Sequence, residues 1–234
     1  MLGLPDSISA LLFDLDGVLT TTAALHERAW KQVFDEYLQR RSPGDRPFSH
    51  DDYLDHVDGR SRDDGIRQFL ESRQIEVDEA TVHDIGERKN RLLLSLIERD
   101  GVAPFDGSVK YLSAVRDAGF AIGVVTSSAN GRAVLDAADL SGFVDARIDG
   151  VVIAERKLRG KPAPDAFLAG ADALGVGPDR AAVFEDAVAG VQAGHDGHFG
   201  YVVGVNRGDR ADDMRAAGAD VVVDDLADLL KDDT

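Results

Sequence analysis

The sequence predicts an α/β fold in which a parallel-sheet core carries one inserted helical region. Two patterns support this prediction. Short apolar segments alternate with segments of helical periodicity over most of the 234 residues. The alternation is interrupted once, between Ala24 and Ile97, by a stretch with helical periodicity and no strand-like segment. Alternating strands and helices are typical of a parallel sheet that is covered by helices on both faces.

The predicted strands are short runs rich in Val, Ile, Leu, Ala or Phe without polar alternation, as expected for strands buried on both faces. In chain order they are Ile8–Phe13, Ala121–Thr126, Ala181–Phe184, Gly200–Val205 and Val221–Val223. The predicted core helices are Ser108–Ala118, Asn130–Ala138, Pro164–Leu174, Ala187–Gly194 and Asp209–Ala217. This order corresponds to a Rossmann-like core, in which ligands bind at the carboxyl ends of the strands.

The inserted region is predicted to form a helical cap domain. Its first half carries an apolar residue at every fourth position, at Leu25, Ala29, Val33 and Tyr37. A second apolar stripe consists of Val82, Ile85, Leu92, Leu93 and Leu96. We expect a core domain formed by residues 1–23 and 98–234, and a cap domain formed by residues 24–97 that lies over the ligand-binding edge of the sheet.

The composition excludes several classes of function. There are 43 acidic and 26 basic residues, and the resulting net charge of −17 opposes binding to nucleic acid or to anionic membrane surfaces. The absence of cysteine excludes disulfides, thiolate catalysis and cysteine-ligated zinc. No apolar run reaches the roughly 20 residues of a membrane helix, and the N-terminal residues do not resemble a signal peptide. We therefore expect a cytoplasmic protein with no nucleic-acid or membrane partner, and the self-contained cap favours a monomer.

Acidic pairs follow two of the predicted strands. Asp14 and Asp16 come after the first strand, and Glu185 and Asp186 come after the strand that begins at Ala181. Carboxylates this close repel one another unless a cation neutralises them or one of them carries a proton. Oxygen ligands from two strand ends are suited to Mg²⁺. Capping of the following helix is the alternative explanation for the second pair.

Two further segments place polar groups at strand ends. The sequence VVTSSAN supplies Thr126, Ser127, Ser128 and Asn130 at the start of a predicted helix, where phosphate oxygens are commonly bound. Lys161 precedes a Pro-x-Pro sequence that prevents early helix formation and holds the lysine in a rigid loop. These two segments and the two acidic pairs together form a specific pattern.

The pattern resembles the haloacid dehalogenase-like superfamily, whose members transfer phosphoryl groups through an aspartate nucleophile. DLDGVLT, VVTSS, KPAPD and FEDAVAG resemble its four motifs in order, and the helical insertion is similar to its cap. Within the superfamily, the segments TAALHERAWK, DGRSRDDGI and ERKNRLL resemble the β-phosphoglucomutase branch. The resemblance extends over essentially the whole chain.

The resemblance implies roles for the core residues. Asp14 would be the nucleophile and a ligand of Mg²⁺, and Asp16 would be the general acid/base, with its backbone carbonyl also at the metal. Glu185 and Asp186 would complete the protein ligands of the metal. The resemblance assigns the oxygens of the transferring phosphoryl group to Thr126 and Lys161.

It also implies roles around the cap. Arg62 would bind the second phosphate of the substrate, with Ser128 and Asn130 assisting from the core, and Ser127 would also bind substrate. Lys89, which falls on the second apolar stripe, would contact the sugar together with Asn90. The hinge that moves Asp16 would consist of Thr22 and His26.

The implied function is Mg²⁺-dependent phosphoryl transfer on a small phosphorylated sugar through an aspartyl phosphate, most simply as a sugar-phosphate mutase. Thr21 and Ala129 depart from the pattern of that branch and leave the substrate open. One alternative is a phosphatase that acts on a small phosphorylated sugar or metabolite. A more remote alternative is a non-catalytic phosphosugar-binding protein.

Overall fold

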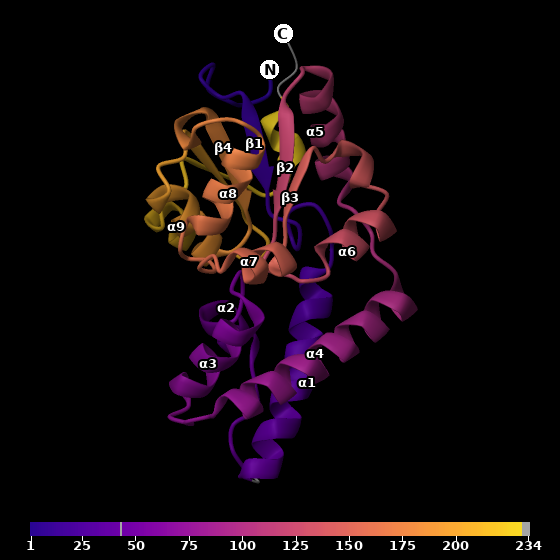
Figure 1. The fold of residues 1–234 in the computed structure, drawn as a ribbon, viewed down its shortest axis with the longest axis vertical. Coiled ribbons are helices and arrows are strands. Elements are labelled where there is room, and N and C mark those ends of the chain that lie inside the picture. Colours follow the sequence, from indigo (N-terminus) through magenta and orange to yellow (C-terminus); the bar gives the residue numbers. More distant parts are fainter. Residues whose placement is uncertain (43, 231–234) are drawn as a thin grey trace.

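The computed structural model describes residues 1–42 and 44–230 and has a sheet-containing core and a helical cap (Figure 1). The core contains one parallel sheet with the strand order β3-β2-β1-β4-β5-β6. Its strands are β1 (Ala10–Phe13), β2 (Ala121–Val125), β3 (Ala146–Ile148), β4 (Ala181–Glu185), β5 (Tyr201–Val205) and β6 (Val221–Val223). The predicted α/β, Rossmann-like fold class is confirmed.

Helices cover both faces of the sheet (Figure 1). Strand β1 sends Leu11 and Phe13 to one face, where they join a cluster that includes Tyr111, and sends Leu12 to the other face, where the cluster includes Phe167. The core helices are α5 (Asp106–Asp117), α6 (Gly131–Ala137), α7 (Gly150–Arg156), α8 (Asp165–Ala173), α9 (Val188–Asp196) and α10 (Ala211–Ala216). Short 3₁₀ turns are η1 (Ser141–Phe143), η2 (Pro178–Arg180) and η3 (Leu226–Leu229).

The register of the sheet aligns the strand ends that precede the predicted site. Phe13 of β1 pairs with Val124 of β2 on one side and with Phe184 of β4 on the other. The residues that follow these three strands therefore lie at the same edge of the sheet. The rings of Phe13 and Phe184 stack with their centroids 4.3 Å apart, and this contact stabilises the pairing of β1 with β4.

The cap consists of the helices α1 (Ala23–Arg41), α2 (His50–His56), α3 (Arg62–Ser72) and α4 (Glu79–Asp100). It lies against the carboxyl edge of the sheet (Figure 1). Phe34 is at the centre of its core, with ring centroids 5.0 Å from Trp30, 5.0 Å from Phe48 and 4.3 Å from Phe69. The predicted limits of the two domains stay a prediction, although α1 begins one residue before Ala24 and α4 continues to Asp100.

Two elements of the core were not predicted from the sequence. Strand β3 has only three residues, and Arg147 at its centre hides it from a search for apolar runs. Helix α7 follows it directly, capped by Asp149, whose side chain accepts hydrogen bonds from the backbone N–H groups of Val151 and Val152 (both 3.1 Å). Within the described part of the chain, no helix is both long enough and apolar enough to span a membrane.

Candidate active site

The centre of the site is a buried group of charges at the ends of β1 and β4. Asp14 and Glu185 are 6% and 0% exposed, and Lys161, which is 2% exposed, reaches both of them. The Nζ of Lys161 donates a hydrogen bond to Asp14 Oδ1 at 2.5 Å and another to Glu185 Oε1. The backbone N–H of Asp14 donates to the Phe184 carbonyl at 2.9 Å, so the two strands themselves hold the carboxylate in place.

Burial and charge act in opposite directions on this group. Burial raises the pKa of Asp14, and the nearby Lys161 ammonium opposes this shift. For Lys161 burial favours the neutral amine, but the two carboxylates outweigh it and raise the pKa of the lysine. Lys161 therefore stays charged and is available to balance negative charge beside Asp14.

A third carboxylate completes a cation-binding arrangement. Asp14, Glu185 and Asp186 each offer one oxygen, and these three atoms lie within 4.8 Å of one another. Gly17, at φ +90°, makes room for Asp186, because a Cβ at residue 17 would lie 1.8 Å from Asp186 Oδ2. Hard oxygen donors in this number suit Mg²⁺, and the residues present therefore fit a divalent cation.

The alternative explanation for the second acidic pair, helix capping, does not account for its position. The N-cap residue of α9 is Ala187, and the helix has no side-chain cap. Glu185 accepts one hydrogen bond from the Ala187 backbone N–H at 3.2 Å, but its other oxygen is bound to Lys161.

The second aspartate of the first pair turns toward the cap. Thr22 Oγ1 donates a hydrogen bond to Asp16 Oδ1, and Thr126 Oγ1 donates to Asp16 Oδ2 at 3.3 Å. The Nε2 of His26 lies 3.6 Å from Asp16 Oδ1. Burial raises the pKa of Asp16, with the Thr22 hydrogen bond and the charge of Lys89 opposing the shift. Asp14 and Asp16 thus occupy different surroundings although only one residue separates them.

Lys89 and His26 form a buried polar pair beside Asp16. Lys89 is 5% exposed, and its Nζ lies 3.2 Å from His26 Nδ1 and 4.9 Å from the centroid of the Trp30 ring. Burial lowers the pKa of Lys89 to about 7 and, together with Lys89, lowers that of His26 well below its usual value. When the ammonium donates to Nδ1, the proton of the neutral imidazole is on Nε2, which faces Asp16. The hydrogen bond to His26 explains why a lysine occupies a position on an otherwise apolar stripe.

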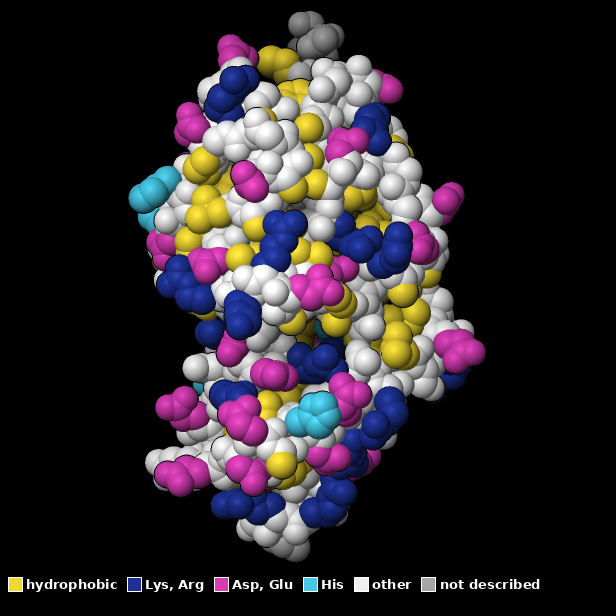
Figure 2. All heavy atoms as spheres, viewed as in Figure 1, with side chains coloured by type: hydrophobic (Ala, Val, Ile, Leu, Met, Phe, Trp, Pro, Cys, Tyr) yellow, Lys and Arg dark blue, Asp and Glu magenta, His cyan; other side chains and the backbone are white. Residues whose placement is uncertain are grey.

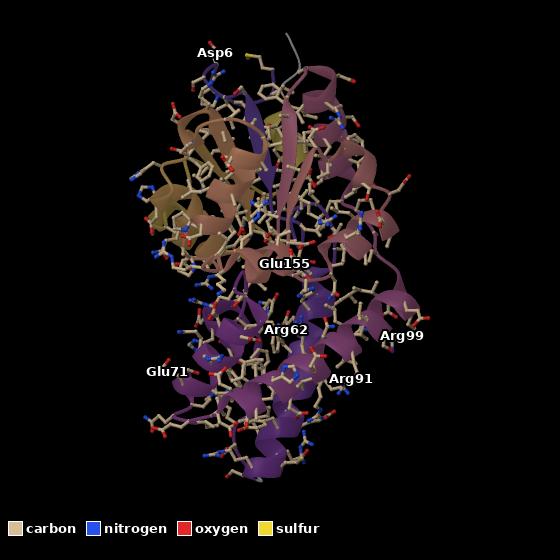
Figure 3. The ribbon with its side chains drawn as sticks, in the orientation of Figure 1. Asp6, Arg62, Glu71, Arg91, Arg99 and Glu155 are labelled. Atoms are coloured by element: carbon tan, nitrogen blue, oxygen red, sulfur yellow. The ribbon has the colours of Figure 1, made fainter. Side chains whose placement is uncertain are left out.

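A cavity of about 570 Å³ lies between the core and the cap. Of the residues predicted to bind substrate, Thr22 is buried behind Asp16 and does not line the cavity. The others all line it: His26, Arg62, Lys89, Asn90, Ser127, Ser128 and Asn130. Figure 2 shows Lys and Arg side chains (dark blue) on both sides of the indentation between the two parts. In Figure 3, Arg62 lies on the side of the cap that faces the core.

Hydrogen bonds join the core and the cap beside this cavity. Asn130 Nδ2 donates a hydrogen bond to Asn90 Oδ1 at 3.0 Å, and Ser127 Oγ donates to the Gly59 carbonyl at 2.9 Å. Arg62 is held by its own cap, since Nη1 donates to the Gly86 carbonyl and to Glu87 Oε1, both at 3.2 Å. The remaining guanidinium nitrogens of Arg62 have no hydrogen bond within the described part of the protein.

Sequence reasoning missed several residues of the cavity, among them the polar residues Tyr53 and Asp58. Tyr53 is on α2, and Asp58 is in the linker between α2 and α3. The Tyr53 hydroxyl is hydrogen-bonded to Asp58. Two positions depart from the family pattern. Ala129 lines the cavity. Thr21 lies just before α1 and donates a hydrogen bond to the Ala103 carbonyl, which follows the last helix of the cap.

Comparison with known proteins agrees with this arrangement. Residues 8–198 match the family model of haloacid dehalogenase-like hydrolases. The chain belongs to the haloacid dehalogenase-like hydrolase family. It is 51% identical to a protein from Mycobacterium bovis named Beta-phosphoglucomutase, over 98% of this chain and 94% of that protein.

Two further members show the range of the family. The crystal structure of a beta-phosphoglucomutase from Clostridium difficile superposes with a TM-score of 0.80 and 27% identity, and covers 95% of this chain and 93% of its own. Hexitol phosphatase A from Escherichia coli is 33% identical over 78% of this chain and 76% of that protein. Mutases and phosphatases are thus both similar to this member of the family.

Proposed function

We propose that this protein is a β-phosphoglucomutase that interconverts β-glucose 1-phosphate and glucose 6-phosphate by Mg²⁺-dependent phosphoryl transfer. The observation that carries the proposal is the pair of aspartates at one cavity. Asp14 is bonded to a buried lysine, whereas Asp16 is bonded to groups at the start of the cap. Two carboxylates in such different surroundings suit two tasks, attack on phosphorus and transfer of a proton.

In the first step, a carboxylate oxygen of Asp14 bonds to phosphorus while the bond between phosphorus and the departing sugar oxygen breaks. Lys161 balances the negative charge on the phosphoryl oxygens, and Thr126 at the end of β2 offers a hydroxyl at the same edge. The aspartyl phosphate then passes its phosphoryl group to a sugar hydroxyl in the reverse of this step.

Asp16 gives its proton to the departing oxygen and later takes one from the attacking hydroxyl. Its raised pKa favours the protonated form that this task requires. Thr22, His26 and Lys89 orient the carboxylate from the side of the cap. Because Thr22 lies at the start of α1, the position of Asp16 depends on the position of the cap.

Asp14, Glu185, Asp186 and the backbone carbonyl of Asp16 would hold Mg²⁺. When bound, the cation neutralises charge on the transferring phosphoryl group. In the same proposal Arg62, Ser128 and Asn130 bind the phosphate that does not react, and Lys89 and Asn90 contact the sugar. The free guanidinium nitrogens of Arg62 support this assignment, since a bidentate arginine suits a phosphate.

The test is an assay of purified protein with Mg²⁺, β-glucose 1-phosphate and a trace of glucose 1,6-bisphosphate. We expect glucose 6-phosphate to form faster than free phosphate is released. The α-anomer of glucose 1-phosphate is the matched control and should not be converted. Release of free phosphate without any glucose 6-phosphate would contradict the proposal.

That outcome would favour the second candidate, a phosphatase. The similarity to Hexitol phosphatase A supports this candidate. The two activities differ in whether water or a sugar hydroxyl accepts the phosphoryl group, and exclusion of water by the closed cap decides between them. A set of phosphorylated hexoses and hexitols, assayed for free phosphate, would then identify the substrate.

A binding protein without catalysis is separated from both enzymes by Asp16→Ala. In an enzyme this variant should lose about 10²–10⁴-fold in turnover while it still binds substrate. Wild-type protein that binds β-glucose 1-phosphate but neither isomerises nor hydrolyses it would identify a binding protein.

A further inference from the structure

The linker between α2 and α3 brings an additional carboxylate, Asp58, into the site from the cap. Asp58 lines the same cavity as Asp14 and Asp186. It is held in place by hydrogen bonds from the Tyr53 hydroxyl and from the backbone N–H of Gly59. Burial raises the pKa of Tyr53 well above its usual value, so the phenol keeps its proton and donates to the carboxylate.

The linker is packed directly against the core beside the cation-binding carboxylates. A Cβ at Gly59, which has φ +72°, would lie 2.8 Å from the Cβ of Ala187, the residue that follows Asp186. The Gly59 carbonyl accepts the hydrogen bond from Ser127 Oγ at 2.9 Å. Gly59 is therefore fixed between two loops of the core, and the neighbouring Asp58 is fixed close to Asp186.

Two carboxylates meet across this junction, Asp58 on the cap and Asp186 on the core. Both line the same cavity, and the residues that follow them in the chain, Gly59 and Ala187, are in contact. Lys161 bonds to Asp14 and Glu185. Within the described part of the chain, neither Asp58 nor Asp186 forms an ion pair with a lysine or arginine. Two carboxylates on opposite sides of a closing interface repel each other unless a cation lies near both.

We propose that Asp58 contributes its negative charge to the Mg²⁺ site from the cap, so that binding of the cation and closure of the cap are coupled. This inference rests on the cation site of the proposed function. Without the cation, repulsion between Asp58 and Asp186 favours separation of the cap from the core. With the cation, both carboxylates are attracted to the same charge. Coupling of this kind is reciprocal, so a closed cap also strengthens binding of the cation.

The first test is the dissociation constant for Mg²⁺, measured by isothermal titration calorimetry without substrate. Asp58→Asn keeps the shape of the side chain and should weaken binding about tenfold. Asp51→Asn is the matched control: it removes the same charge from the same cap segment, but Asp51 is exposed at the start of α2 and does not line the cavity. The control should bind Mg²⁺ like the wild type.

Tyr53→Phe provides a second variant that keeps the charge of Asp58 but removes the bond that orients it. It should weaken Mg²⁺ binding less than Asp58→Asn does. Equal affinity of wild type and Asp58→Asn would overturn the inference and leave the proposed function intact. Failure of the wild type to bind Mg²⁺ would instead overturn the cation site of the proposed function.

The second test measures closure itself, as the radius of gyration by small-angle X-ray scattering with and without saturating Mg²⁺. The wild type and Asp51→Asn should become more compact when Mg²⁺ is added, and Asp58→Asn should show no such change. Equal Mg²⁺-dependent compaction in all three proteins would overturn the coupling.

Discussion

The core and the cap hold their functional groups in different ways. In the core, Lys161 donates hydrogen bonds to Asp14 and Glu185 at the ends of two paired strands, and all three side chains are nearly inaccessible to solvent. In the cap, the Arg62 side chain is 32% exposed and is held by two bonds to a neighbouring helix. This difference is consistent with the proposal that residues of the core carry out the chemistry and residues of the cap select the substrate.

The two parts also differ in how they are stabilised. The core buries an apolar sheet between layers of helices. The cap has a small aromatic cluster and, beside it, the buried carboxylate of Asp52, which pairs with Arg73 at 2.7 Å and with Arg46 at 2.8 Å. We therefore expect substitutions in the core site to affect turnover and substitutions in the cap to affect either substrate affinity or cap stability.

The largest effect is expected for Asp14→Asn. Loss of the proposed nucleophile should lower kcat by at least about 10⁴-fold. Substrate binding, measured by calorimetry, should remain, because Lys161 keeps Glu185 as a partner and the cap residues are unchanged. Turnover within a factor of ten of the wild type would show that Asp14 is not the nucleophile. It would also contradict the assignment of the chemistry to the core.

The next largest effect is expected for Phe34→Ala in the cap. Removal of a fully buried ring from the aromatic cluster should cost about 3–5 kcal/mol of stability. Trp30 is the only tryptophan of the chain and stacks on Phe34, so its fluorescence reports unfolding of the cap. Phe34→Leu, which leaves a smaller void, is the matched control. The same loss in both variants would show that the cost does not depend on the size of the void, and little loss in Phe34→Ala would show that the cluster tolerates a gap.

A smaller effect, on substrate affinity, is expected for Arg62→Ala. Loss of a charged hydrogen-bonding partner for phosphate should raise KM about 10²-fold and change kcat less. The control is Arg67→Ala, on the same helix, whose guanidinium pairs with Glu79 at the surface. An equal rise of KM in both variants would indicate a general effect of charge rather than a contact in the cavity.

The smallest effect is expected for Asp52→Asn, which should destabilise the cap by about 1–2 kcal/mol at neutral pH. Burial raises the pKa of Asp52, but hydrogen bonds from Ser49 and Arg73 outweigh burial and lower it below its usual value. A lowered pKa stabilises the folded protein above the unfolded value, near pH 4, and this contribution disappears as the pH falls further.

The measurement for this variant is denaturant unfolding as a function of pH, followed by the fluorescence of Trp30. The difference between wild type and Asp52→Asn should be constant above about pH 5 and should shrink in more acidic solution. A difference that does not depend on pH would show that packing, and not the charge of Asp52, stabilises this part of the cap.

Much of the core was predictable from the sequence because its functional residues follow apolar strands. Asp14, Thr126 and Glu185 each follow such a run, and parallel pairing brings the ends of these runs to one edge. Lys89 could also be singled out, since a lysine on an apolar stripe needs a polar partner, and the structure supplies His26. The roles assigned to these residues remain predictions.

Asp58 was not predictable because nothing in its residue type distinguishes it. Its segment also contains Asp51, Asp52, Asp55, Asp63 and Asp64. What separates Asp58 from these residues is the contact of Gly59 with Ala187, which joins segments more than a hundred residues apart in the chain. Strand β3 was missed for a related reason. Its position depends on pairing with β2, and its three residues are too few to form an apolar run that can be recognised in the sequence.

The strand order has a consequence for the growing polypeptide. The central strand β1 is made first, but it pairs on one side with Ala121–Val125 and on the other with Ala181–Glu185. A nascent chain that stops before Ala181 lacks β4 and two of the three carboxylates of the cation site. A truncated product of this kind therefore lacks most of the oxygen donors proposed to hold Mg²⁺, and the proposed site can be completed only after β4 has been synthesised.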